Sequence, residues 1–229
     1  MTVILLRHGR STSNTAHVLA GRSEGVELDD TGLGQAAALV DRIGALPVRA
    51  LVRSPLLRCR QTLEPLAVAL GLEALVDERL SEVDYGQWTG RKIAELVKEP
   101  LWQVVQAQPS AAVFPEGEGL AHVQARAVGA VREHDRRLAD EHGGDALWIA
   151  CTHGDVIKAV IADALGTHLD SFQRITADPA SMSVIRYTPL RPFVVHVNHT
   201  GAQLAAGLTR RPADGDVPAG DAVPGGTPE

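Results

Sequence analysis

Short runs of apolar residues alternate along this chain with longer segments of helical periodicity. Parallel strands that are covered on both faces carry nearly continuous apolar side chains. Runs of this kind span residues 2–6, 50–52, 74–76 and 146–151. Two further strand candidates are residues 182–187 and 192–197.

Between these runs, apolar residues recur at the spacing of one helix face. The helical segments begin near residues 31, 55, 90, 120 and 154 and end near residues 44, 70, 106, 142 and 165. Strands that alternate with helices predict an α/β fold, in which a mostly parallel sheet carries helices on both faces.

Prolines modify two of the predicted helices. Pro55 is expected to be the first residue of its helix, because the fixed φ of proline suits that position. Pro65 is expected to kink or interrupt the same helix, and Pro100 to interrupt the next one.

Length and composition indicate one folded domain followed by a tail. A chain of 229 residues is long enough for one sizeable α/β domain and short for two. Beyond about residue 204 the sequence turns to proline, glycine and aspartate, which bury too little apolar surface to fold. We therefore assign residues 1–203 to one domain and expect residues 204–229 to be a disordered tail.

Charge and cysteine content exclude several classes of partner. The net charge of -6 and the lack of a long basic run argue against nucleic acid. No stretch approaches the roughly 18 apolar residues of a membrane span, and the apolar start is too short for a signal peptide. Cys59 and Cys151 form no Cys-x-x-Cys pair, so we predict no metal site and no disulfide. These features predict a cytoplasmic protein that binds no membrane.

Two of the predicted strands end in the same way. Residues 6–9 read Leu-Arg-His-Gly and residues 151–154 read Cys-Thr-His-Gly. Ligands of open α/β sheets bind beyond the carboxyl ends of the strands. If the two strands are neighbours, His8 and His153 face one pocket, and Gly9 lets the backbone approach a ligand closely.

Three more side chains are expected at the same edge of the sheet: Arg7, Arg58 in the helix after the second strand, and Glu82 in a later loop. Two arginines offer forked donors for phosphate oxygens, and a neutral imidazole can attack phosphorus. The second histidine can donate to the same oxygens, and a carboxylic acid can protonate the leaving oxygen. The set predicts phosphoryl transfer through a phosphohistidine, without a metal or cofactor because the positive charge comes from the protein.

The motifs that carry this chemistry also have a familiar order and spacing. They are residues 7–9 with Ser11 and Asn14, residues 54–62, residues 80–90 (the acid loop), residues 114–118 and residues 152–154. Together they resemble the histidine phosphatase superfamily, in its phosphoglycerate-mutase-like branch. The resemblance covers about residues 2–200, so it makes residues 1–203 the catalytic domain.

The resemblance implies a role for each residue of the set. His8 would accept the phosphoryl group, and Glu82 would be the proton donor. The phosphoryl group and substrate would be bound by Arg7, Asn14, Arg58, His153 and Gly154. The fold implied is a three-layer α/β/α sandwich with a mostly parallel central sheet, and the segment from Trp88 to about Gly119 would cover the pocket.

Three positions depart from the family's pattern. Arg10 stands where Glu or Gln is common, Thr89 where Glu is usual, and Gly119 where Ser is frequent. Arg10 is a candidate substrate-binding residue, which would favour a more anionic substrate; the alternative is that it points outward. Arg22, Arg60 and Arg91 are interpreted as surface cations.

The family contains both phosphatases and mutases. A mutase must hold a second anionic group during transfer, and the glycolytic mutases carry paired arginines in an insertion after the acid loop. Residues 99–113 contain neither arginine nor lysine. We therefore predict a phosphatase that acts on a small phosphorylated metabolite. The alternatives are a phosphoglycerate-type mutase and a non-catalytic phosphate-binding or regulatory protein. Relatives are often dimers or tetramers, so the default expectation is a homodimer.

The remaining histidines are interpreted as ordinary surface or core residues. They are His17, His122, His134, His142, His168, His196 and His199. The last two lie three residues apart, a spacing that places side chains on opposite faces of a regular strand and argues against a metal pair.

Overall fold

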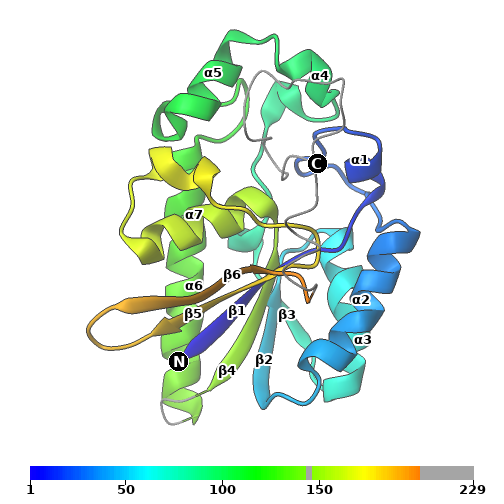
Figure 1. The fold of residues 1–229 in the computed structure, drawn as a ribbon, viewed down its shortest axis with the longest axis vertical. Coiled ribbons are helices and arrows are strands. Elements are labelled where there is room, and N and C mark those ends of the chain that lie inside the picture. Colours follow the sequence, from blue (N-terminus) through cyan, green and yellow to red (C-terminus); the bar gives the residue numbers. More distant parts are fainter. Residues whose placement is uncertain (143–145, 202–229) are drawn as a thin grey trace.

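The structure, a computed structural model, describes residues 1–142 and 146–201. At its centre lies a six-stranded sheet with the strand order β3-β2-β4-β1-β5-β6 (Figure 1). The strands are β1 (Thr2–Arg7), β2 (Val48–Arg53), β3 (Ala74–Val76), β4 (Leu147–Thr152), β5 (Met182–Tyr187) and β6 (Pro192–His199). Strands β1 to β4 are parallel, and β5 and β6 complete one edge as antiparallel strands. The prediction of a mostly parallel sheet is confirmed.

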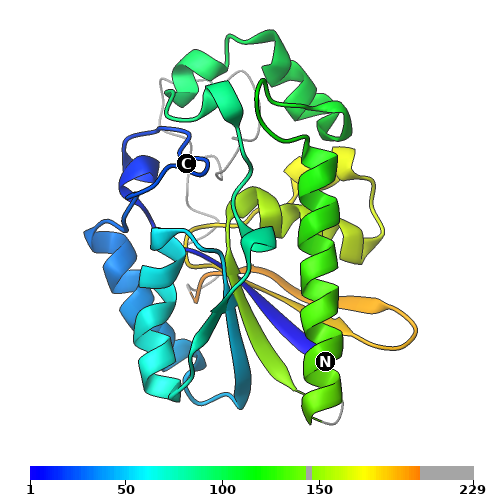
Figure 2. The ribbon, with the colours of Figure 1, turned by 180° about the vertical axis from the view of Figure 1, so that it is seen from behind.

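Helices cover both faces of this sheet, so the fold is a three-layer α/β/α sandwich (Figures 1 and 2). The helices α2 (Asp30–Ile43) and α3 (Leu57–Leu70) pack on one face, and α6 (Leu120–His142) and α7 (Gly154–Leu165) pack on the other. Alternate side chains of β1 divide between the two cores. Burial on both faces explains why β1 is a continuous apolar run.

Smaller elements lie beyond the carboxyl ends of the parallel strands (Figure 1). They are the short helices α1 (Thr12–Thr15), α4 (Ile93–Leu96) and α5 (Pro100–Ala107). The 3₁₀ turns are η1 (Glu78–Leu80), η2 (Gly86–Trp88), η3 (Pro109–Ala111) and η4 (Leu169–Arg174). Aromatic packing holds the segment after the acid loop in place, because Trp88 stacks on Trp102 with ring centroids 6.2 Å apart and meets Phe114 edge to face at 5.3 Å.

The three prolines behave differently from one another. Helix α3 begins at Leu57 and not at Pro55, because the extended residue before Leu57 is its N-cap. Pro65 lies inside α3 without interrupting it. The neighbouring side chains Leu63 and Leu66 are buried in the core, and this packing offsets the hydrogen bond that proline cannot donate. Pro100 separates α4 from α5 as predicted.

The prediction that His196 and His199 lie on opposite faces of a strand is wrong. Their ring centroids are 6.0 Å apart. Strand β6 shifts register against β5 between these residues, and Asn198 adopts a positive φ of 55°. The extra residue of this bulge brings both rings to the same side.

The structure bears on the predictions about the tail, a membrane span and the cysteines to different extents. The predicted tail, residues 204–229, lies outside the described residues, so the division into residues 1–203 and 204–229 stays a prediction. Within residues 1–142 and 146–201, no helix combines the length and apolar character needed to cross a membrane. Cys59 and Cys151 are free thiols, and both are buried.

Candidate active site

The two strand ends that carry histidine meet in the middle of the sheet. Strands β1 and β4 are neighbours in parallel register, with Arg7 opposite Thr152. His8 and His153 therefore follow adjacent strands, and their rings meet edge to face with centroids 5.2 Å apart. The expectation that two imidazoles share one place at the carboxyl edge holds in the structure.

The backbone around His8 is fixed on three sides. The His8 amide donates to the carbonyl of Thr152 at 3.0 Å, and the His8 carbonyl accepts from the Ala180 amide at 3.1 Å. The Gly9 amide donates to the hydroxyl of Thr62 at 2.9 Å. These bonds tie the histidine to β4, to the segment before β5 and to α3, so its ring is held by the rigid part of the fold.

The hydrogen bonds of the His8 ring assign its tautomer. Nδ1 lies 2.7 Å from the carbonyl oxygen of Gly9, which can only accept, so Nδ1 carries the proton. Nε2 is then left with its lone pair. Burial, reinforced by the positive charges of Arg58 and Arg7, holds the pKa of His8 well below its ordinary value of 6.5. His8 is therefore a neutral imidazole with a nucleophilic nitrogen at neutral pH.

Gly9 serves the packing of the loop. A Cβ atom at Gly9 would lie 2.9 Å from the carbonyl oxygen of Gly32 in α2. A Cβ atom at Gly32 would in turn overlap the carbonyl oxygen of Arg10. The close approach that these glycines allow is between the loop and the first turn of α2, whereas the sequence suggested an approach to a ligand.

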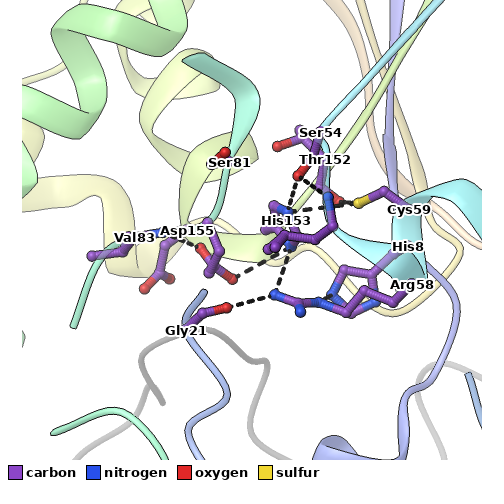
Figure 3. Close-up of polar contacts among 12 residues, drawn as sticks. His8, Gly21, Ser54, Arg58, Cys59, Ser81, Val83, Thr152, His153 and Asp155 are labelled. Carbon is purple, nitrogen blue, oxygen red and sulfur yellow. Dashed lines mark hydrogen bonds and ion pairs between the residues drawn. The ribbon is translucent and has the colours of Figure 1, made fainter. Parts of the chain in front are cut away.

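Arg58 lies between the two histidines (Figure 3). Its Nε is 3.3 Å from Nε2 of His8, and its Nη2 is 3.2 Å from Nδ1 of His153 and 2.8 Å from the carbonyl oxygen of Gly21. Its buried Nη1 has no hydrogen-bond partner among the described residues. A buried guanidinium with an unused donor beside two imidazoles has the chemistry to hold an anion.

Arg7 is the second buried arginine, with 1 % of its surface exposed. Its Nη1 donates to the carbonyl of Ala177 at 2.5 Å. Burial lowers its pKa, and the nearby carboxylates of Glu82, Asp155 and Asp178 act in the opposite direction.

His153 occupies the N-cap position of α7, and Gly154 begins that helix. Because Arg58 Nη2 can only donate, Nδ1 of His153 is the acceptor. Nε2 then donates to the hydroxyl of Ser54 at 2.8 Å. Burial and Arg58 keep the pKa of His153 well below 6.5. His153 is thus neutral, with its lone pair toward the arginine.

Glu82 completes the group from the acid loop. Its Oε2 lies 3.8 Å from Nδ1 of His153, and its Oε1 accepts from the Val83 amide at 2.9 Å. Burial, together with the negative charge of Asp155, raises the pKa of Glu82 to about 7. A carboxyl group of this kind can both give and take a proton near neutral pH.

A second buried charge cluster, which sequence reasoning did not single out, lies beside Glu82. Asp155 accepts from the Tyr85 hydroxyl at 2.8 Å and pairs with Nζ of Lys158 at 3.3 Å. Asp155 and Lys158 are 1 % and 2 % exposed. The one available signal was the position of Asp155, directly after His153-Gly154.

Two arginines hold the backbone of the acid loop. Arg126 donates through Nη1 to the carbonyls of Arg79 at 2.6 Å and Ser81 at 2.8 Å, and through Nη2 to that of Glu82 at 3.1 Å. Arg22 donates through Nε to the same Glu82 carbonyl at 2.9 Å. Arg22 was interpreted as a surface cation, but this bond gives it a structural role.

The carboxylate of Glu118 joins both arginines. It receives Arg126 at 2.9 Å through each of two nitrogens and Nη2 of Arg22 at 2.7 Å. It also accepts from the Asp84 amide at 3.0 Å. We call Arg22, Glu118 and Arg126 the acid-loop clamp, since together they fix the segment that carries Glu82.

Asn14 and Arg10 lie in the loop and short helix after His8. Oδ1 of Asn14 accepts from the amide of Ser11 at 3.0 Å and from its hydroxyl at 2.8 Å. Arg10 pairs through Nε with Asp29 at 2.6 Å and donates through Nη2 to Thr31 at 2.7 Å. The structure thus places Arg10 in an ion pair at the start of α2, and none of its hydrogen bonds reaches the two histidines.

The described residues hold no group of three or more His, Cys, Asp or Glu side chains arranged to bind a metal ion. The positive charge beside the histidines comes from Arg7 and Arg58. The arrangement as a whole combines a neutral imidazole that keeps a lone pair, a buried arginine with an unused donor, and a carboxyl group whose pKa is raised to about 7.

Comparisons with known proteins agree with this geometry. A model of the family described as "Histidine phosphatase superfamily (branch 1)" matches residues 3–200. Phosphoserine phosphatase 1 of Hydrogenobacter thermophilus is 29% identical over 204 residues, which are 86% of this chain and 92% of that protein. A probable phosphoglycerate mutase, GpmB, of Yersinia pestis is 28% identical over 82% of this chain and 85% of its own length.

A solved structure shares the fold. The mycobacterial glucosyl-3-phosphoglycerate phosphatase in complex with VO3 superposes with a TM-score of 0.78 at 25% identity, over 86% of this chain and 98% of that chain.

Proposed function

The chain belongs to the histidine phosphatase superfamily, and from this premise we propose that it is a metal-independent phosphatase acting on a small phosphomonoester through a phosphohistidine on His8. The observation that carries the proposal is the place of Arg58, between Nε2 of His8 and Nδ1 of His153, with one buried donor unused. A phosphoryl group held by this donor lies next to a nitrogen that carries a lone pair.

In the first step, Nε2 of His8 attacks phosphorus, and the bond from phosphorus to the ester oxygen breaks. Glu82 gives its proton to the departing oxygen, so the alcohol leaves neutral and Glu82 becomes a carboxylate. Arg7 and Arg58 stabilise the charge on the phosphoryl oxygens. His153 takes up a proton at Nδ1 from the bound phosphomonoester monoanion and then donates a hydrogen bond to the same oxygens.

In the second step, water attacks the phosphohistidine. The Glu82 carboxylate takes a proton from the attacking water, the bond from phosphorus to Nε2 breaks, and inorganic phosphate is released. His8 and protonated Glu82 are then restored. The amide nitrogen of Asn14, whose oxygen is occupied by Ser11, and the first turn of α7 at Gly154 are proposed as further phosphate donors.

A phosphatase is favoured over a phosphoglycerate-type mutase by the segment after the acid loop. Residues 99–113 contain no arginine or lysine, and Trp102 and Val105 within it are buried in the core. The nearby cation Arg91 is paired with Glu99 at 2.7 Å. A mutase needs a second anion site to hold its substrate between two transfers, and residues 99–113 offer no cation for one; Lys92 and Lys98 are exposed and precede that stretch.

The relatives are named for different phosphomonoesters, namely phosphoserine and glucosyl-3-phosphoglycerate. We therefore propose a phosphorylated hydroxy acid or sugar as the substrate class and test it with a panel. Phosphate release is measured from phosphoserine, phosphoglycerates and sugar phosphates in the presence of EDTA, and phosphoglycerate interconversion is measured in parallel.

The decisive variant is His8→Ala, with His196→Ala as a control at an exposed histidine. We expect release to survive EDTA, to fall by on the order of 10³-fold or more in His8→Ala, and to stay unchanged in His196→Ala. Rapid acid-free quenching with a radiolabelled substrate should trap phosphate on the native protein alone. Release that persists in His8→Ala would overturn the mechanism, and interconversion without release would identify a mutase.

A further inference from the structure

We propose that Asp155, held by Tyr85 and Lys158, is a positioning residue that keeps the proton on Glu82 in the resting protein, before each phosphoryl transfer. The proposal deepens the function proposed above and rests on it. It concerns the second buried charge cluster, which the phosphohistidine mechanism leaves unused.

Two carboxyl groups are buried together at the carboxyl edge of the sheet. Glu82 comes from the acid loop and Asp155 from the first turn of α7, and Figure 3 shows Asp155 on the acid-loop side of the two histidines. Glu82 is 3 % exposed and Asp155 is 1 % exposed. Asp155 and Glu82 repel each other when both are charged, and two buried like charges cannot form without cost, so one of the two groups holds a proton.

The hydrogen bonds decide which of the two stays charged. Asp155 receives the Tyr85 hydroxyl at 2.8 Å and the Lys158 ammonium at 3.3 Å. Lys158 is itself anchored, because it donates to Gln173 at 3.0 Å and lies 5.5 Å from the centre of the Phe172 ring. A donor and a cation at one carboxylate favour its charged form.

Glu82 has weaker support for a negative charge. Its side chain accepts one backbone hydrogen bond, from Val83. The neighbouring histidine, His153, is neutral, and the clamp arginines bind the Glu82 carbonyl and not its carboxyl group. Arg58 and Arg7 favour ionisation, but burial and the charge of Asp155 outweigh them.

The groups that face this carboxyl pair come from every surrounding element. They are Arg7 and His8 from the end of β1, Arg58 from α3, Tyr85 from the acid loop, and His153, Asp155 and Lys158 from the end of β4 and α7. Asp155 and Glu82 are the two carboxylates among the charged neighbours of both Arg7 and Tyr85. Removing the charge of Asp155 therefore leaves burial to raise the pKa of Glu82 against the opposing effects of Arg58, Arg7 and the Val83 amide.

A proton on Glu82 matters most in the first step, in which the ester oxygen leaves phosphorus. An alkyl ester needs a proton at its leaving oxygen, whereas an aryl ester such as p-nitrophenyl phosphate leaves as a stable anion. The effect of Asp155 is therefore expected with alkyl phosphates and is expected to be small with the aryl ester.

The test is the pH dependence of kcat/KM in Asp155→Asn, a substitution that keeps the shape and can still accept from Tyr85. The alkaline limb of the profile is the fall in kcat/KM as Glu82 loses its proton. For the best alkyl phosphate of the panel, we expect this limb to move to lower pH by about one unit. Lys158→Gln is the second variant. It removes the positive charge that balances Asp155, so the negative charge of Asp155 acts more strongly on Glu82 and the alkaline limb should move to higher pH.

Asp135→Asn is the matched control. Asp135 is also a buried carboxylate on a helix and accepts from an aromatic donor, the Trp148 indole, at 3.2 Å. This variant should leave the alkaline limb in place. An unchanged limb in Asp155→Asn, or a uniform loss of activity at every pH with both esters, would show that Asp155 is merely structural.

The outcome is separable from that of the proposed function. If His8→Ala retains activity, the phosphohistidine route fails whatever Asp155 does. If His8→Ala is inactive and labelled phosphate is trapped on the native protein, an unshifted limb in Asp155→Asn overturns this inference alone.

Discussion

Arg126 binds the backbone of Glu82, with its Nη2 3.1 Å from the Glu82 carbonyl oxygen. The arginine belongs to α6, the long helix that packs on the sheet, and 9% of its side chain is exposed. The residue proposed as proton donor is therefore located by a helix more than 40 positions away in the sequence, acting through the acid-loop clamp. A loop that must present a carboxyl group accurately is thus tied to the rigid part of the fold.

This relationship predicts that Arg126→Met lowers kcat with alkyl phosphates by about 10- to 100-fold while KM changes little. The substitution keeps the apolar stem but removes the three carbonyl contacts, so Glu82 loses its fixed position. Steady-state kinetics with alkyl and aryl esters check the prediction, since the aryl ester depends less on the proton donor.

Arg132→Met is the matched control, because Arg132 lies on the same helix and pairs with Asp163 at 2.7 Å on the surface. It should keep full activity. An equal loss with both esters in Arg126→Met, or a loss explained by unfolding in a denaturant titration, would contradict a positioning role.

The opposite pKa shifts of His8 and Glu82 predict the pH profile. The nucleophile must be neutral, and the pKa of His8 lies well below 6.5, so the acid limb lies in acidic solution. The donor must be protonated, and the pKa of Glu82 is about 7, so activity toward alkyl phosphates falls as the pH rises through 7. Measuring kcat/KM across the pH range checks this order, and a profile that rises through pH 8 would contradict it.

Two glycines of α2 predict opposite effects on stability. Gly32→Ala places a Cβ atom against the carbonyl oxygen of Arg10, which forces backbone to move and should lower the free energy of unfolding by about 1–3 kcal/mol. Gly34→Ala meets no atom within 4 Å and should raise it by about 0.5–1 kcal/mol, since alanine favours a helix interior. Urea denaturation of both variants tests the pair, and equal effects would contradict the packing described.

The ion pair of Arg10 predicts that this residue contributes little to catalysis. Because Asp29 and Thr31 hold its guanidinium, Arg10→Ala should change kcat/KM by less than about 3-fold. Arg58→Lys should reduce it by on the order of 10²-fold, since one ammonium cannot replace a fork that contacts both histidines. A large effect of Arg10→Ala on KM would restore Arg10 as a substrate-binding residue.

The sheet and the paired histidines could be predicted because their signals are local. A continuous apolar run identifies β1 and β4, and parallel neighbours end at the same edge, which brings His8 and His153 together. The positions of Arg58 and Glu82 followed from motif spacing, and the structure brings both to that edge.

The supporting residues could not be predicted, because their partners are distant in the sequence. Asp155 and Lys158 lie three apart on a helix, a spacing that in most sequences marks an exposed ion pair. Only the packing of α7 against the acid loop shows that both are buried. Arg126 and Glu118 likewise resemble the solvated face of a long helix until the carbonyls of the acid loop are seen beside them.

The bulge in β6 is a third case. A regular strand separates His196 from His199, and the extra position had only a weak mark in the sequence, since asparagine tolerates the positive φ of Asn198. Register shifts of this kind depend on pairing with β5, which the sequence of one strand does not contain.

The buried carboxyl group of Glu82 also predicts a gain in stability when it is removed. Its pKa is raised from 4.5 to about 7 on folding, so its favourable contribution is complete below pH 4.5 and is lost as the pH rises through 7. At pH 8 the native protein carries a buried charge that the amide of Glu82→Gln does not. The variant should therefore be more stable than the native protein by about 1–3 kcal/mol at pH 8, with the difference closing toward pH 5.

Urea denaturation at pH 8 and pH 5 measures this difference in the free energy of unfolding. Glu95→Gln, at an exposed glutamate of α4, is the control, and its difference from the native protein should be the same at both pH values. A Glu82→Gln variant that is less stable at pH 8 would show that the carboxyl group is held in place as a charged group, which contradicts its assignment as a proton donor.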